Sequence, residues 1–120
     1  MIERIEGLSE NMVGFKFARQ VTEKEYEEVI FPAIKDQLTK QAKLRILCYF
    51  AEDTKVSLGA MWDDTVMGLK HYFDWEQIAV VTDLAWIKHS FKAFGFLIKG
   101  HLKIYPADEM QQAIDWLEER

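Results

Sequence analysis

Few residues of this chain have the types and spacing that catalysis or metal binding requires. Asp63 and Asp64 are adjacent carboxylates near the start of an expected helix, and His71 follows Asp64 by seven positions. Neighbouring helix positions point about 100° apart, so the two aspartates cannot act together on one substrate. Near a helix N-terminus, both carboxylates favour the helix dipole instead. A zinc site needs further ligands at short spacing, and no pattern supplies them from His89 or His101. No metal site is predicted.

The sequence evidence for a catalytic nucleophile is equally weak. The single cysteine, Cys48, lies in the apolar run 44–50, where a thiol is typically an inert core residue. The chain contains no glycine-rich phosphate loop of the P-loop or dinucleotide type. No Ser-His-Asp or Cys-His arrangement is recognisable. The sequence therefore predicts a protein that is not an enzyme and that needs no cofactor.

Length and composition predict one domain over residues 1–120. Hydrophobic residues make up 49% of the chain and charged residues 29%, an ordinary balance for a globular domain. The net charge of −5 argues against nucleic acid, whose binding needs clustered Lys and Arg. No stretch approaches the roughly 18 consecutive apolar residues of a membrane span. Charges within residues 1–7 argue against a signal peptide, so a cytoplasmic location is expected.

The N-terminal half predicts a hairpin followed by a helix. Residues 1–7 resemble a weak strand, and 12–19 alternate apolar with small or polar side chains, as a half-buried strand does. Thr22 and Glu25 form a predicted capping box that begins the helix. Pro32 falls inside the helical pattern and should kink it or begin a second piece.

The C-terminal half alternates strands with helices. The predicted elements are a buried central strand at 44–51, a helix at 59–73, a buried strand at 78–83, a helix at 84–98, an edge strand at 101–106 and a helix at 107–120. Asp83 is expected to cap the helix 84–98. One broad face of the helix 59–73 carries Met61, Trp62, Val66, Leu69, Tyr72 and Phe73. This order predicts an α/β fold, with a mostly parallel sheet of about five strands, an antiparallel first strand and four helices.

Two segments, 58–88 and 104–117, carry a family resemblance. The Gly-Leu-Lys-His segment at 68–71, the Ile-Ala-Val-Val strand at 78–81 and an Ala-x-x-Trp-Leu ending at 113–117 occur in the order typical of the SpoIIAA-like family. This family is related to the STAS domains of anti-sigma factor antagonists and sulfate-transporter tails. The resemblance implies a single STAS-like domain without established enzymatic activity. Its fold is also similar to the lipid-carrying CRAL-TRIO domain, which implies an apolar ligand or a membrane as partner.

Ser57 lies where anti-sigma factor antagonists carry a phosphorylatable serine. In those proteins the serine is usually part of an Asp-Ser-Ser-Gly-Leu motif at the start of the second helix. Here the corresponding stretch is 55–64, and the acidic neighbour and the second serine are missing. We therefore do not expect Ser57 to be a regulatory switch.

The predicted helix 84–98 has an unusually wide apolar face. This face spans about half of the helix circumference, more than the roughly 100° stripe that packing on a core requires. It comprises Leu84, Trp86, Ile87, Phe91, Ala93, Phe94, Leu97 and Ile98. Lys88, Lys92 and Lys99 lie on the opposite side, beside Phe96. Basic residues that flank aromatic ones are typical of an interfacial helix, although a wide apolar face is also compatible with simple burial in a core.

Together these patterns predict a non-enzymatic binding domain for an apolar small molecule or a lipid, peripheral to the membrane. The residues expected to line the ligand pocket, between the helices 59–73 and 84–98, are Trp62, Met67, Trp86 and Phe94. The residues expected to contact a membrane are Lys88, Lys92, Phe96 and Lys99. The alternative is a protein-interaction module of the antagonist type, whose partner is another protein or a second copy of the chain.

Overall fold

The structure is a computed structural model that describes residues 1–70, 74–94 and 101–119. Its elements are β1 (Ile2–Arg4), β2 (Met12–Phe17), β3 (Gln20–Val21), α1 (Glu23–Glu25), η1 (Tyr26–Ile30), α2 (Phe31–Lys40), β4 (Leu44–Phe50), β5 (Lys55–Val56), α3 (Leu58–Lys70), β6 (Trp75–Val81), α4 (Ala85–Phe94), β7 (His101–Tyr105), η3 (Ala107–Glu109) and α5 (Met110–Glu118).

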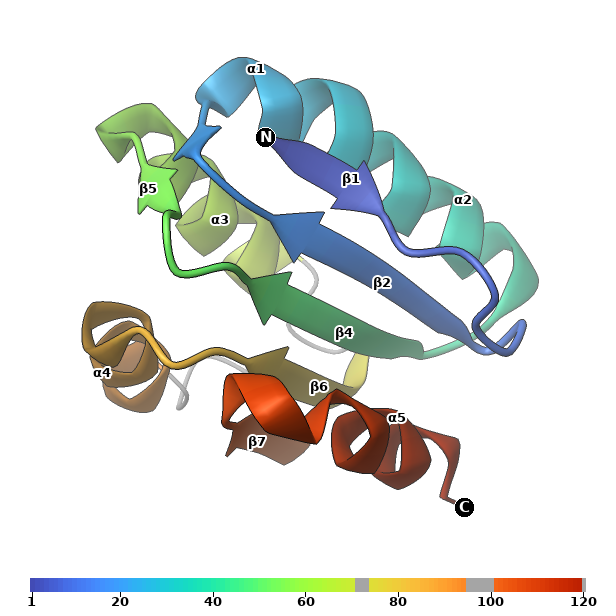
Figure 1. Ribbon diagram of the computed structural model, residues 1–120. Helices are drawn as coiled ribbons and strands as arrows, with labels where there is room; N and C mark the ends of the chain where they lie inside the picture. The colour runs from blue at the N-terminus through green and yellow to red at the C-terminus, as the bar shows by residue number, and fades with distance from the viewer. Residues whose placement is uncertain (71–73, 95–100, 120) are drawn as a thin grey trace.

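The main sheet has five strands in the order β1-β2-β4-β6-β7 (Figure 1). β1 is antiparallel to β2, and the other neighbouring strands are parallel. The predicted fold class is thereby confirmed. β4 has neighbours on both sides and is covered on both faces, which is why its sequence is an almost continuous apolar run. The short strands β3 and β5 form a separate parallel pair that the sequence pattern did not predict.

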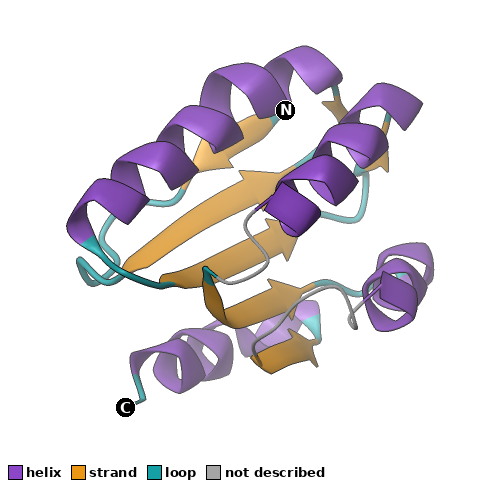
Figure 2. Ribbon diagram, turned by 180° about the vertical axis from the view of Figure 1, so that it is seen from behind, coloured by secondary structure: helices purple, strands orange, loops and turns teal. Residues whose placement is uncertain are grey.

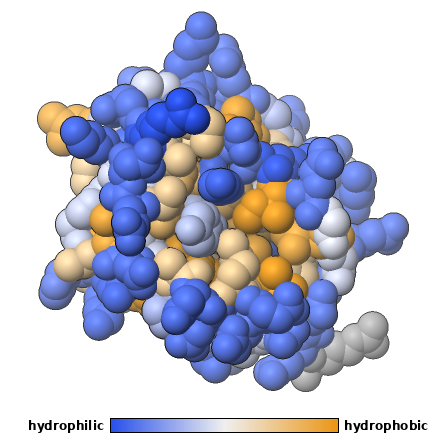
Figure 3. All heavy atoms as spheres, in the orientation of Figure 1, coloured by the Kyte–Doolittle hydropathy of each residue, from blue (hydrophilic) through white to orange (hydrophobic). Residues whose placement is uncertain are grey.

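Helices cover the two faces of the sheet unequally (Figures 1 and 2). The larger apolar cluster joins one sheet face to η1, α2, α3 and α4. The smaller cluster lies on the opposite face, where Ala113, Trp116 and Leu117 of α5 pack against β4 and β6. Figure 3, drawn in the orientation of Figure 1, shows apolar side chains in the middle of this second face, surrounded by polar ones. Each face therefore has its own core.

The predicted start of the first helix is confirmed. The Thr22 side chain accepts a hydrogen bond from Glu25 N, and the Glu25 carboxylate accepts one from Thr22 N, which completes the capping box. A five-residue π-helical segment, η1, follows at once. Pro32 then lies in the first turn of α2. The helix therefore continues in a second piece, as Pro32 predicted.

Glu25 also ties the helix start to β1 and to the amino group of Met1. Its carboxylate accepts a hydrogen bond from Ile2 N at 2.7 Å and lies 3.2 Å from the Met1 ammonium group. Burial alone would raise the pKa of Glu25. The hydrogen bond from Ile2, the bond and charge of the Met1 amine, and the bond from Thr22 outweigh burial and lower the pKa below its ordinary value of 4.5.

Arg45 holds the C-terminal end of α5 against the sheet. Its side chain is largely buried and forms an ion pair with Glu76 on the neighbouring strand β6. The same guanidinium donates to Leu117 O at 2.6 Å and to Glu119 O. These carbonyls belong to the last turn of a helix, where no helical N–H is available to them. Arg45 thus connects β4, β6 and α5.

Candidate functional site

The two helices that carry the predicted pocket residues each follow a strand: α3 follows β5, and α4 follows β6. Ser57 precedes α3, and its hydroxyl oxygen accepts a hydrogen bond from Ala60 N at 3.1 Å, so the side chain caps the helix. Ahead of α4, Thr82 Oγ1 accepts a bond from Leu84 N. Asp83 was predicted to cap α4, but its carboxylate accepts a bond from Ala107 N, at the start of η3.

Helix α3 turns apolar side chains toward solvent. Leu58 is 85% exposed and Trp62 is 69% exposed, and Met61 and Val66 are also exposed. We call these four residues the α3 stripe; their spacing of three and four positions places them along one side of the helix. The small side chain of Ala60 faces the core instead. Three members of the predicted broad apolar face, Met61, Trp62 and Val66, are therefore exposed and not part of the core.

Helix α4 combines a buried side with an exposed tryptophan. Ile87 is buried, and the ring of Phe91 packs against Phe50 with centroids 6.0 Å apart, as the wide apolar face predicted. Trp86, next to Ile87 in the chain, is 40% exposed. Lys92 is exposed and Lys88 is half-buried. The described part of α4 thus has a core side, and Trp86 reaches solvent beside it.

The side chains of four predicted site residues lie outside what the structure describes. The side chains of Met67 and Phe94 lie outside what the structure describes, and so do residues Phe96 and Lys99. Trp62 and Trp86 are described as two exposed side chains on separate helices, and Figure 2 shows α3 and α4 on the same side of the sheet. A pocket between them stays a prediction.

Three carboxylates meet where α1 and η1 contact α3. One ligand oxygen from each of Glu23, Glu27 and Asp63 lies within 4.8 Å of the others, close enough to hold a cation. Asp63 Oδ2 is buried and accepts no hydrogen bond from the described residues. Glycine at position 59 permits the close approach, because a Cβ atom there would lie 2.4 Å from Glu23 Oε2.

Sequence reasoning missed this acidic cluster of Glu23, Glu27 and Asp63. Glu23 and Glu27 are four residues apart, a spacing that places them on one helix side. Asp63 comes from a helix that follows two strands later, so the local pattern does not reveal it. Oxygen-only ligands of this kind suit hard cations such as Mg²⁺ or Ca²⁺. Glu23 and Glu27 are exposed, however, and acidic groups at a surface are common without an ion. We interpret the cluster as a site of charge repulsion.

No helix among the described residues is both long enough and apolar enough to cross a bilayer.

Comparison with known proteins identifies the family and the fold. Residues 12–118 match the family model described as SpoIIAA-like. A crystal structure of an uncharacterized protein with a SpoIIAA-like fold from Shewanella loihica superposes with a TM-score of 0.76 at 23% identity. The match covers 97% of this chain and 93% of that chain, so the whole architecture is shared. None of the curated proteins matches the chain.

Proposed function

Because the chain belongs to the SpoIIAA-like family, we propose that it is a non-enzymatic binding domain that takes a lipid or another apolar partner on α3 and α4. The observation that supports this proposal is the exposure of the α3 stripe, above all of Leu58 and Trp62. Isolated apolar residues at a surface are ordinary, but neighbouring ones on one helix side form a patch of the kind that binds partners.

The side chains of the stripe suit the edge of a lipid bilayer. Removal of apolar surface from water stabilises a complex by about 25 cal/mol per Å². Leu58 and Trp62 therefore gain free energy when they enter an acyl-chain layer. Tryptophan has an apolar body and a polar N–H, and it is enriched at the level of lipid headgroups for that reason. The stripe, which lies in the first three turns of α3, would enter the interface, with the sheet remaining in water.

Electrostatic attraction contributes less to membrane binding than apolar insertion does, and the negative charge of the chain opposes it. Each lysine near an anionic leaflet contributes about 1 kcal/mol, and α4 offers Lys88 and Lys92. The net charge of −5 and the acidic cluster beside α3 oppose this attraction. The binding is therefore driven mainly by apolar insertion and is reversible, with a modest dependence on salt.

The alternative function is a protein-interaction module of the antagonist type. The observation that favours it is the position of Leu58, which directly follows the capping residue Ser57 and is almost fully exposed. A partner protein that covers the start of α3 would bury the same stripe. Lipid and protein partners would thus use one surface, and the following experiment separates them.

Sedimentation with vesicles of phosphatidylcholine and phosphatidylserine tests the lipid function. We expect the protein to pellet with vesicles at low salt and to keep most of its binding at about 0.5 M salt, where the Debye length is a few ångströms. Trp62→Ser should abolish the salt-resistant part, whereas Trp62→Phe, which keeps an apolar ring, should retain it. Replacement of Lys88 and Lys92 by glutamine should remove the salt-sensitive part, and Lys35→Gln on α2 serves as the charge control. A wild-type protein that stays in the supernatant at low salt would exclude the lipid function and favour a protein partner.

A further inference from the structure

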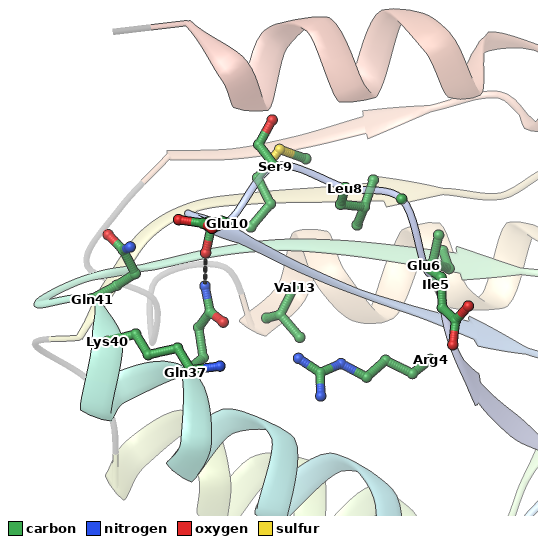
Figure 4. A pocket seen from close by; sticks show the side chains of 12 residues that line it. Arg4, Ile5, Glu6, Leu8, Ser9, Glu10, Val13, Gln37, Lys40 and Gln41 are labelled. Atoms are coloured by element: carbon green, nitrogen blue, oxygen red, sulfur yellow. Dashed lines mark hydrogen bonds between the residues drawn. The ribbon is translucent and has the colours of Figure 1, made fainter.

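A cavity of about 590 Å³ lies between the β1–β2 connection and the C-terminal half of α2 (Figure 4). It includes no residue of the α3 stripe. Its volume falls within the range of small-molecule sites in proteins. The lining residues are Arg4, Ile5, Glu6, Gly7, Leu8, Ser9, Glu10, Met12, Val13, Gln37, Lys40 and Gln41. None of these residues was singled out by the sequence patterns.

The loop that forms one wall of the cavity is fixed by its own contacts. Ile5 N donates to Gly14 O at 2.8 Å, and Met12 N donates to Ser9 O at 3.0 Å. Leu8 packs directly on Gly14, where an added Cβ atom would lie 2.7 Å from Leu8 Cδ1. Gly7 turns the loop with a φ of +81°, a conformation that favours glycine. The wall is therefore formed before any ligand arrives.

Gln37 places a hydrogen-bond acceptor inside the cavity. The residue is only 3% exposed, and its Nε2 donates to Glu10 O at 2.8 Å. Because Glu10 O is an acceptor, the amide nitrogen must lie on that side. The amide oxygen is then left on the cavity side, where Figure 4 shows it. A ligand that donates a hydrogen bond can use this oxygen.

Two cationic side chains enter the cavity from opposite elements. Figure 4 shows the Arg4 guanidinium reaching in from β1 and the Lys40 ammonium group from α2, while the Glu6 carboxylate points away. Within the described part of the chain, the Arg4 side chain has no ion pair or hydrogen bond. Lys40 lies 3.3 Å from Asp36 Oδ2, in an exposed pair of the kind that contributes little. Both cations are thus available to an anion.

Of the apolar residues that line the cavity, Val13 belongs to the larger cluster on the α2 side of the sheet, and Met12, Leu8 and Ile5 belong to the smaller cluster on the other side. Val13 and Met12 of β2 are buried. Leu8 and Ile5 pack against the smaller core cluster from the loop. These groups suit a ligand that combines an acidic group, a hydrogen-bond donor and a small apolar body.

We propose that the cavity between the β1–β2 connection and α2 binds a small organic anion of this kind, such as a hydroxycarboxylate. The acid group pairs with Arg4 and Lys40, the hydroxyl donates to Gln37 Oε1, and the apolar body lies over Val13. Arginine suits this task because its fork of N–H donors matches the two oxygens of a carboxylate. The inference is independent of the proposed function, since it uses no residue of α3 or α4.

Titration of the ¹⁵N-labelled full chain with mandelate, followed by NMR, tests the proposal. Mandelate has a carboxylate, a neighbouring hydroxyl and an apolar ring; phenylacetate lacks the hydroxyl, mandelamide lacks the charge, and inorganic phosphate lacks the ring. We expect saturable shifts in the backbone amides of residues 5–12 and 37–41 with mandelate. Phenylacetate and mandelamide should each bind about tenfold more weakly, the loss expected for one charge-assisted or buried hydrogen bond. Phosphate should also bind more weakly, because it makes no apolar contact.

Variants locate the binding in this cavity. Arg4→Gln and Lys40→Gln should each weaken mandelate binding about tenfold, whereas Lys35→Gln, on the same helix as Lys40 but outside the cavity, should leave it unchanged. Unchanged spectra for the remainder of the chain establish that the variants are folded. The proposal is wrong if mandelate causes no saturable shift in these amides, or if a folded Arg4→Gln protein binds it as tightly as the wild type.

Discussion

Arg45 on β4 and Glu76 on β6 form an ion pair between neighbouring strands, and the same guanidinium also holds the carbonyl oxygens at the end of α5. One side chain therefore links the central sheet to the helix that covers its second face. Because that face has a separate apolar cluster, the attachment of α5 does not depend on the helices behind the sheet.

Loss of the Arg45 guanidinium should loosen α5. We expect Arg45→Met to lower the free energy of unfolding by about 2 kcal/mol, because Leu117 O and Glu76 lose a charged donor in a partly buried position. Urea unfolding measures the change, and hydrogen exchange in residues 113–118 should increase most. Lys16→Met, on the exposed part of β2, is the control. Equal exchange in α5 for both variants would contradict this role.

The acidic cluster should destabilise the fold at neutral pH. Glu27→Gln keeps the shape of the side chain and removes one of three neighbouring negative charges. We expect a gain of about 0.5 kcal/mol in the free energy of unfolding at low salt, since like charges four residues apart on a helix repel by this order. The gain should fade as salt is added. Thermal melts compare it with Glu52→Gln, a carboxylate in an exposed turn, which should show no such gain.

Glu25 should make stability depend on pH in the acid range. Its folded pKa is lowered below 4.5. The unfolded chain therefore binds the proton more tightly than the folded chain. The stabilisation is fully present above pH 4.5 and is lost as the pH falls through the folded pKa.

Glu25→Gln should remove this pH dependence. Urea unfolding at neutral pH and at a pH below 4.5 should show a smaller difference for the variant than for the wild type. Glu28→Gln, which replaces a carboxylate on the exposed side of η1, should leave the difference unchanged. An identical acid response in wild type and Glu25→Gln would show that other carboxylates determine it.

Trp86 and Ile87 are adjacent and should respond in opposite ways to substitution. Ile87 is buried in the larger cluster, so Ile87→Ser should cost about 3 kcal/mol or more and can prevent folding. Trp86 is exposed, and Trp86→Ser should change stability by less than about 1 kcal/mol. Circular dichroism melts of the two variants measure the difference. A Trp86→Ser protein as unstable as Ile87→Ser would mean that the Trp86 ring belongs to the core.

The features that were predictable from sequence are those that depend on neighbouring residues or on element order. The capping box of Thr22 and Glu25 spans four residues, and the order of strands and helices required a parallel sheet. The orientation of α3 was not predictable, because Ala60 faces the core while larger apolar side chains face solvent. An argument from hydrophobic periodicity places the large apolar side chains of a helix in the core and the small ones outside it.

The cavity between the β1–β2 connection and α2 and the acidic cluster were not predictable from the sequence for a different reason. Arg4 and Gln37 meet only because the β1–β2 connection folds over the sheet beside α2. Asp63 reaches Glu23 only because α3 packs beside α1. In both sites the partners come from elements that are distant in the chain, so no local pattern links them.

The π-helical segment Tyr26–Ile30 also affects how the chain can change in evolution. A π-helical turn contains one residue more than an α-helical turn needs, and its i→i+5 bonding absorbs the surplus. Deletion of a single residue from 26–30 would restore ordinary α-helical bonding without a break. The residues of α2 that face the sheet, such as Ala33 and Ile34, would keep their side. Homologues one residue shorter at this point can therefore share the fold, and their alignment gap belongs within the helix.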